Sequence, residues 1–332
     1  MRRIAGLITI LSSLLLATPC VASDDDEKPS LNQLEGHSHD AIVVRSKPVI
    51  ERLALKVIEP VDLKLSSAGQ VFVADRKAEC VFRLDSDGSV SLPVERLPNI
   101  QRIQVDRDGS LFVLASSDGE CELYQITSNG QRVLLGAFPF PSDCFARDDV
   151  GLFVLGVRKQ GRLVSFSPDG TVSELVRLPS EAMDVTFNAG GQLEALTASG
   201  HIIQVNDAGA ATVSGFAPVG ARRLTSLSDG SVLALYSMPG AKAQVVFVCR
   251  EADRPAEFQV AASVPVGTRA VGFDSLGNLC LANPDLRAVT KVTSHFEVPC
   301  PHCGKLVPMV LNPDGPEANK ENGANGGESR TF

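Results

Sequence analysis

The sequence of 332 residues contains no Trp and only two Tyr. These side chains build most of the stacking platforms that hold single-stranded nucleic acid, so their scarcity argues against such a surface. Positive charge is also in deficit, because 31 Lys and Arg stand against 39 Asp and Glu, which gives a net charge of −8. The long-range field of the chain therefore repels phosphate backbones and anionic lipids. We expect no nucleic-acid partner.

The longest apolar run lies at the N-terminus. Arg2 and Arg3 precede an apolar stretch from Ile4 to Ala17. The stretch is short for a membrane span and has the layout of a secretory signal peptide. We predict a signal peptide over residues 1–22, export to the periplasm or the extracellular space, and no membrane span after cleavage. A lipid anchor through Cys20 is the alternative.

Two segments lack any apolar periodicity. Residues 23–47 begin with an acidic run and contain His37 and His39, and residues 312–332 are rich in Pro, Gly, Asn and Glu. Such compositions bury too little apolar surface to fold by themselves. We predict a disordered acidic leader and a disordered tail. The two His residues are interpreted as part of a polar linker, with a transition-metal site as the alternative.

A turn of small polar residues with a Gly, followed by an apolar strand, recurs through the middle of the chain. The turn glycines are 40, 42, 40, 39 and 47 residues apart, at Gly69, Gly109, Gly151, Gly191, Gly230 and Gly277. A second Gly turn lies 18 to 21 residues later in four of the units, at Gly88, Gly130, Gly170 and Gly209. Two hairpin turns divide a unit into four strands. Six such units predict an all-β, six-bladed β-propeller over residues 48–298.

The sixth unit lacks its second Gly turn, so the sequence supplies only three strands for it. An open ring would leave a sheet edge without a partner. The segment from Val49 to Val57 precedes the first unit and can supply the missing strand. We predict that it pairs with the strand around Val289, so that an N-terminal strand joins the last blade and closes the ring.

Residues 60–75 read Pro-Val-Asp-Leu-Lys-Leu-Ser-Ser-Ala-Gly-Gln-Val-Phe-Val-Ala-Asp, and with the strand that begins Cys80-Val-Phe-Arg-Leu-Asp they resemble an NHL repeat. Residues 267–283 of the last unit are similar. The resemblance covers roughly residues 50–298 and implies the same six-bladed fold. The NHL family, like the related propellers that resemble gluconolactonase and senescence marker protein, includes scaffolds, binding proteins and enzymes. Fold alone therefore does not give the function.

The related lactonases hold a divalent cation with Glu, Asn and Asp, and in two of their repeat motifs the ligand lies eight residues before the turn Gly. Those positions are here Val61, Gln101, Asp143, Met183, Arg222 and Arg269. Asp143 is the one anionic side chain among them, whereas a hard cation needs several oxygen ligands. We therefore expect no cofactor, with Ca²⁺ or Zn²⁺ as the alternative. We also expect a protein without enzymatic activity, with a lactonase-like hydrolase or lyase as the alternative.

The positions seven residues before the turn Gly carry further charged side chains. The resemblance places these positions, and those eight residues before the turn Gly, at one mouth of the channel. We predict a ligand-binding rim of charged residues, namely Asp62, Arg102, Asp143, Asp184, Arg222, Arg223 and Arg269. Arginine can bind a carboxylate or a phosphate in a bidentate manner. The alternative is that these arginines and aspartates pair with one another. No catalytic residue is assigned, and His201 and His295 are interpreted as surface or turn residues.

Residues 299–311 contain Cys300-Pro-His-Cys303-Gly and are predicted to form a knuckle after the propeller. In an exported protein, Cys300 and Cys303 favour a local disulfide. A metal site or a redox pair is the alternative. As a whole, the sequence predicts an exported NHL-type propeller that binds a protein, a peptide or a small molecule on one face of the ring.

Overall fold

The computed structural model is built from strands, and the described residues contain no helix. It describes residues 43–44, 49–106, 108–127, 129–167, 169–206, 209–227, 231–237, 243–250, 258, 260–274, 278–293, 296–299 and 306–308. The predicted signal peptide, the predicted tail and all of the leader except Val43–Val44 lie outside these residues. Within the described ranges, no helix has the length and hydropathy of a membrane span.

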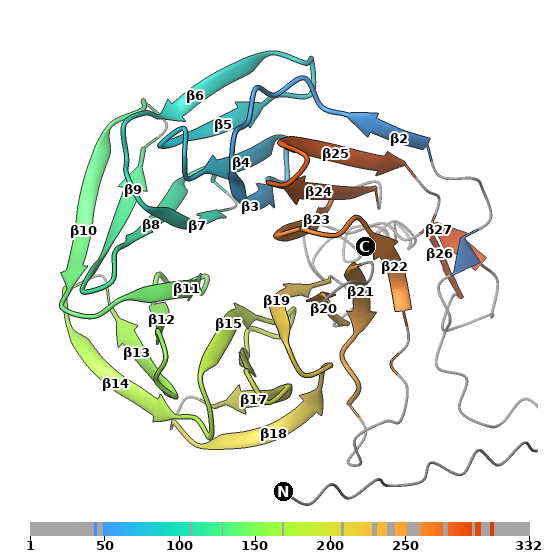
Figure 1. Ribbon diagram of the computed structural model, residues 1–332. Coiled ribbons are helices and arrows are strands. Elements are labelled where there is room, and N and C mark those ends of the chain that lie inside the picture. Colours follow the sequence, from blue (N-terminus) through green and yellow to red (C-terminus); the bar gives the residue numbers. More distant parts are fainter. Residues whose placement is uncertain are drawn as a thin grey trace, which may run out of the picture. The chain divides into compact units, whose positions relative to one another are not determined.

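Six antiparallel sheets of four strands surround a central axis (Figure 1). Blade 1 contains β3 (Pro60–Leu65), β4 (Val71–Asp75), β5 (Cys80–Leu84) and β6 (Val90–Val94). Blade 2 contains β7 (Ile100–Val105), β8 (Leu111–Ser116), β9 (Cys121–Ile126) and β10 (Arg132–Phe138). Blade 3 contains β11 (Ser142–Arg147), β12 (Phe153–Val157), β13 (Arg162–Phe166) and β14 (Val172–Arg177). In each of these blades the first strand is nearest the axis.

Blades 4 and 5 repeat this order. Blade 4 contains β15 (Ala182–Phe187), β16 (Leu193–Thr197), β17 (His201–Val205) and β18 (Ala211–Phe216). Blade 5 contains β19 (Ala221–Ser226), β20 (Val232–Ser237), β21 (Ala243–Phe247) and β22 (Val260–Val264). The all-β, six-bladed fold predicted from the spacing of the turn glycines is confirmed.

The sixth blade takes its outer strand from the other end of the propeller segment. It contains β23 (Ala270–Phe273), β24 (Leu279–Asn283), β25 (Ala288–Thr293) and β2 (Val49–Arg52). Strand β2 pairs antiparallel with β25, and the register joins Val49 to Thr293 and Arg52 to Thr290. This pairing covers the edge of β25.

The described turn glycines adopt positive φ, which residues with a Cβ rarely tolerate. Their φ angles lie between 75° and 96°, at Gly69, Gly88, Gly109, Gly130, Gly151, Gly170, Gly191 and Gly209. The residues around Gly230 and Gly277 lie outside the described ranges. The sequence signal that revealed the repeat is thus a backbone requirement of the hairpins.

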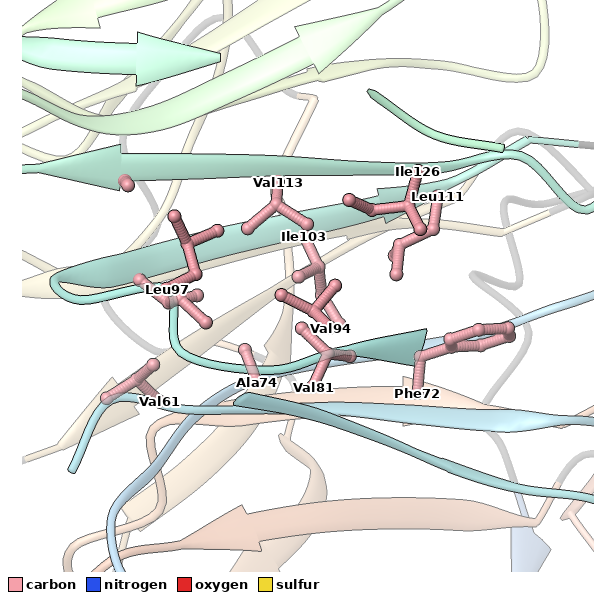
Figure 2. Packing of buried hydrophobic residues seen from close by; sticks show 12 residues of the cluster. Val61, Phe72, Ala74, Val81, Val94, Leu97, Ile103, Leu111, Val113 and Ile126 are labelled. Atoms are coloured by element: carbon pink, nitrogen blue, oxygen red, sulfur yellow. The ribbon is translucent and has the colours of Figure 1, made fainter. Parts of the chain in front are cut away.

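Each blade interface has its own hydrophobic cluster, so the core is a ring of six clusters. Figure 2 shows the cluster between blades 1 and 2, where Val61 and Phe72 pack near Ile103 and Val113. Every residue of the second strands β4 and β8 is buried, because these strands are covered on both faces.

A small sheet accompanies the propeller. It contains β1 (Val43–Val44), β26 (Phe296–Pro299) and β27 (Leu306–Pro308). Strands β26 and β27 precede and follow the Cys300 to Cys303 motif in the sequence, and their register joins Pro299 to Leu306. Both cysteines lie outside the described residues, so the disulfide and the metal site considered for them remain predictions.

Candidate functional site

A β-bulge interrupts the first strand of five blades at an equivalent place. The register skips one residue in each of these strands: Val61, Gln101, Asp143, Met183 and Arg222. They are the residues that lie eight positions before the turn Gly. A bulge breaks the alternation of side chains along a strand and re-aims them. The bulged residue and the one after it can therefore both face the channel.

Residues that follow the bulges form a buried charged network across the channel. Arg102 on β7 donates through Nη2 to Oδ1 of Asp184 on β15 at 2.5 Å, and its Nη1 lies 3.5 Å from Oδ1 of Asp62 on β3. All three side chains are at most 6% exposed. Burial by itself would lower the pKa of Arg102, but the charges of Asp184 and Asp62 hold it above its usual value. The pairing therefore compensates for the loss of solvent.

The two aspartates also tie neighbouring blades together through backbone groups. Asp62 of blade 1 accepts the N–H of Ile103 in blade 2 at 2.9 Å. Asp184 of blade 4 accepts the N–H of Leu224 in blade 5 at 2.8 Å. The remaining oxygen of each carboxylate faces Arg102, so both charges are used within the network.

Arg223 on β19 completes the circle of contacts. Its Nε donates to the carbonyl of Arg269, at the start of blade 6, at 3.0 Å. Its Nη2 donates to the carbonyl of Val61 in blade 1 at 3.4 Å. Arg102 also donates through Nε to the carbonyl of Asp143 in blade 3 at 2.9 Å. Side chains therefore cross the channel and connect all six blades.

A cavity of about 980 Å³ opens at the mouth of the channel. Its lining comes from the beginnings of the first strands and from the turns after the second strands, and all six blades contribute. The charged residues among the lining are Arg76, Asp118, Asp143, Arg158, Lys159, Glu181, Arg222, Arg223 and Arg269. Arg223 lines the cavity and also contacts the blades that the network connects, so the network adjoins the cavity, and we refer to the network as the floor of the cavity.

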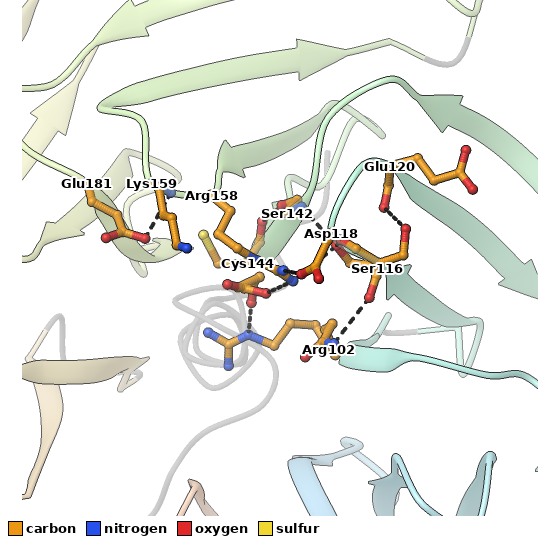
Figure 3. Close-up of polar contacts among 12 residues, drawn as sticks. Arg102, Ser116, Asp118, Glu120, Ser142, Cys144, Arg158, Lys159 and Glu181 are labelled. Carbon is orange, nitrogen blue, oxygen red and sulfur yellow. Dashed lines mark hydrogen bonds and ion pairs between the residues drawn. The ribbon is translucent and has the colours of Figure 1, made fainter.

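On the side of blades 2 to 4, the lining holds three carboxylates, Asp118, Asp143 and Glu181, beside two cations, Arg158 and Lys159. Arg158, which follows β12, donates to Oδ1 of Asp143 at 2.5 Å and to Oδ1 of Asp118 at 3.1 Å (Figure 3). The backbone N–H of Lys159 donates to Oε1 of Glu181 at 2.9 Å. The carboxylates on this side therefore accept hydrogen bonds from donors of the lining itself, whereas Nε of Arg158 is buried and has no partner among the described residues.

On the side of blades 5 and 6, the charges are not paired. Within the described part of the chain, Arg222, Arg223 and Arg269 form no ion pair with a carboxylate. Arg222 and Arg269 are exposed, and Arg223 is half-buried. Burial, together with the charge of Arg102, lowers the pKa of Arg223 to about 10. Arg223 therefore remains a cation at neutral pH.

The structure divides the predicted rim into two groups. Four residues line the cavity: Asp143, Arg222, Arg223 and Arg269. Three lie buried in its floor: Asp62, Arg102 and Asp184. The buried three pair with one another, which is the alternative that the sequence left open. That the lining residues bind a ligand remains a prediction.

Sequence reasoning missed Arg158, Lys159 and Glu181. Arg158 and Lys159 follow the second strand of blade 3, and Asp118 and Arg76 lie in the corresponding turns of blades 2 and 1. Charged residues directly after the buried second strand were the available signal, since these turns lie at the same mouth as the beginnings of the first strands.

No three His, Cys, Asp or Glu side chains gather as a metal site among the residues that the structure describes. Asp143 is the anionic residue at the positions that hold the cation in related lactonases, and here it bonds Arg158. The donor set therefore gives little support to a hard cation. The expectation of no cofactor remains an expectation.

The five cysteines in the described ranges are free thiols. Burial raises the pKa of Cys80 to about 11, and it raises the pKa of Cys121, Cys144 and Cys280 to about 12. Thiols that stay protonated are poor nucleophiles and pack as small hydrophobic groups. None of the five described cysteines lines the cavity.

The fold and the cavity together define a six-bladed β-propeller with a polar pocket at one mouth of its channel. No family model matches the sequence, and no curated protein matches it. Solved structures do resemble it.

Virginiamycin B lyase from Staphylococcus aureus is 14% identical with a TM-score of 0.57, and the match covers 74% of this chain and 99% of that one. A gluconolactonase from Xanthomonas campestris is 12% identical with a TM-score of 0.59, over 77% and 94% of the two chains. An auxiliary nutrient binding protein from Bacteroides ovatus is 12% identical with a TM-score of 0.56, over 74% and 76%. At these identities the shared property is the fold.

Proposed function

We propose that this protein is an exported binding module without enzymatic activity, which takes a small ligand in the cavity at the mouth of its channel. The cavity itself supports this proposal most strongly. Its volume of about 980 Å³ suits a small molecule, and its floor is closed by buried side chains that hold six blades in place. A rigid, polar pocket of this kind binds a ligand with little reorganisation.

The lining favours binding over catalysis. The residues that line the cavity include no His and no Cys. Asp143, the carboxylate at one of the positions that hold the cation in the lactonases, accepts a hydrogen bond from Arg158 through Oδ1, so this oxygen is already engaged. A lactonase-like hydrolase or lyase is the second candidate, because a gluconolactonase and a lyase share the fold. The two candidates differ in whether the protein turns over the molecule that it binds.

Export rests on the N-terminal sequence. Expression of the full chain with its own leader tests it directly by N-terminal sequencing of the mature protein. We expect a new N-terminus at Ser23 or Asp24 in the exported fraction. Retention of Met1 in the cytoplasm, or a lipid mass on Cys20, would contradict this part of the proposal.

Ligand capture tests the binding function. The purified protein is dialysed against a metabolite extract, and bound molecules are identified by mass spectrometry after denaturation. The double variant Ser117→Trp/Ser237→Trp places two indoles in the cavity, and Ser86→Trp places one in an exposed turn of blade 1. We expect a molecule that the wild type and Ser86→Trp enrich and the double variant does not. Equal enrichment of the same molecules by all three proteins would contradict the proposal.

A further inference from the structure

The charge in the cavity is distributed unevenly. On the side of blades 2 to 4, Arg158 is neutralised by Asp118 and Asp143. The side of blades 5 and 6 carries three guanidinium groups without a carboxylate partner in the described part of the chain: Arg222, Arg223 and Arg269. An unpaired cluster of arginines on one wall of a pocket is suited to an anionic group of the ligand.

The local backbone explains why two consecutive arginines share this wall. In a regular strand, Arg222 and Arg223 would point to opposite faces. The bulge in β19 leaves Arg222 without a partner in β20, whereas Arg223 pairs with Leu235. Both arginines consequently line the cavity, together with Arg269 from the start of blade 6.

Arg223 is held in place and still has hydrogen-bond donors available. The carbonyls of Arg269 and Val61 accept from its Nε and Nη2. A guanidinium carries five N–H donors, and Nη1 of Arg223 has no hydrogen-bond partner among the described residues. Because the carbonyls fix the group before any ligand arrives, a bidentate contact through its remaining donors costs little side-chain entropy.

The buried aspartates do not occupy these donors. Asp62 and Asp184 direct their oxygens to Arg102 and to backbone N–H groups. Burial of Arg223 and its repulsion by Arg102 disfavour the charged guanidinium. These two effects outweigh the attraction of Asp62 and Asp184, so the pKa of Arg223 is lowered. A cation that the protein disfavours in this way gains stability from an added anion.

We propose that the cavity recognises a small molecule through an oxyanion, a carboxylate or a phosphate, bound between Arg223 at the floor and Arg222 and Arg269 at the mouth. This inference rests on the binding function proposed above. Because Arg223 is half-buried, a group must enter the cavity to reach it, which favours a small molecule over a flat acidic surface. The net charge of −8 repels anions at long range, so these local contacts supply the selectivity.

Calorimetric titration of the full mature protein at constant ionic strength tests the inference. Citrate is the carboxylate probe, inorganic phosphate and tripolyphosphate are the phosphate probes, and glucose is the neutral control. We expect one of the anionic probes to bind the wild type. Arg223→Gln and the double variant Arg222→Gln/Arg269→Gln should each weaken that binding by about tenfold or more.

The matched control is Arg132→Gln, which removes an exposed guanidinium from outer strand β10 and should leave binding unchanged. Arg222 and Arg269 make no side-chain hydrogen bond among the described residues, so their double variant should keep the wild-type unfolding temperature. Binding by citrate alone identifies the carboxylate, and binding by the phosphates alone identifies the phosphate.

Equal binding to the wild type and the Arg222→Gln/Arg269→Gln variant would overturn the inference. An acidic peptide that binds with this arginine dependence when no small probe binds would also overturn it. If captured ligands are uncharged yet are lost in Ser117→Trp/Ser237→Trp, the oxyanion inference fails while the binding function stands. If no ligand depends on the cavity, the binding function itself fails.

Discussion

Arg102 and Asp184 lie on the first strands of blades 2 and 4, and their side chains meet across the channel with 2.5 Å between Nη2 and Oδ1. Neither blade is the neighbour of the other in the ring. The pair therefore restrains blade 3 between them as well, since Nε of Arg102 bonds the carbonyl of Asp143. The floor of the cavity is for this reason expected to contribute to the stability of the whole propeller.

Replacing Arg102 with Met should destabilise the fold strongly. The substitution leaves Asp62 and Asp184 buried without their cation, and breaking a buried pair in this way costs about 3–5 kcal/mol. Arg177→Met breaks the exposed pair with Glu174 on the outer strand β14 and should cost less than about 1 kcal/mol. Urea unfolding of the two variants measures both values. Similar losses for both would show that the floor has no special role.

Acid should remove the contribution of Asp274 to stability. Burial by itself would raise the pKa of Asp274, but its bonds with Lys291 and Asn278 hold the pKa below the usual 3.8. The unfolded chain therefore takes up a proton more readily than the folded one. The stabilisation is present above pH 3.8 and is lost as the pH falls through the lowered pKa.

Asp274→Asn should accordingly be less stable than the wild type at pH 6, by about 1–3 kcal/mol for the disturbed hydrogen bonds. The difference should shrink as the pH falls below 3.8. Denaturant unfolding across this range measures it, with the exposed Glu120→Gln as the control. A difference that stays constant from pH 6 to strong acid would contradict the assignment.

The segment after β2 should be essential for folding. Leu53, Leu55 and Val57 are buried in the cluster between blades 6 and 1. Loss of one large apolar core side chain costs about 2–5 kcal/mol, and a typical domain is stable by only about 5–15 kcal/mol. A chain that begins at residue 58 should therefore fail to fold cooperatively. A chain that begins at residue 48 should melt close to the mature protein, as followed by circular dichroism. Equal melting of both chains would rule out closure of the ring by this segment.

Asp143 separates the binding module from the lactonase alternative. Because its carboxylate bonds Arg158, we expect purified protein to contain no stoichiometric divalent ion and to hydrolyse no lactone. Asp143→Ala and Asp143→Asn should then leave both measurements unchanged. Elemental analysis and a lactone panel provide the test. A bound divalent ion that disappears together with lactone hydrolysis in Asp143→Ala would establish the enzyme instead.

The fold followed from the sequence because the hairpins need glycine at positive φ, so Gly69, Gly109, Gly151 and Gly191 recur at the period of the blades. The sequence predicted the residues of the rim only in part. The offsets from the turn Gly identified residues near the mouth, but they could not show that Asp62 would be buried while Arg223 would reach the cavity. That difference depends on what faces each side chain across the channel, and such contacts leave no periodic pattern.

The partners of Arg158 also could not be derived from spacing. Its side chain reaches Asp118 in blade 2, and this contact depends on the relative placement of two turns from separate repeats. The bulges that allow Arg222 and Arg223 to share one wall are likewise invisible in the sequence, because no residue type is specific for the skipped position. The sequence predicts the blades well, whereas the pocket arises from their assembly.

A crystal structure of the protein with its captured ligand would show where the ligand binds on the propeller. We expect density for the ligand in the cavity at the mouth, with an oxygen of the ligand within hydrogen-bonding distance of the guanidinium of Arg223. Ligand density confined to the opposite face of the ring, beside the turns at Gly69 and Gly109, would contradict it.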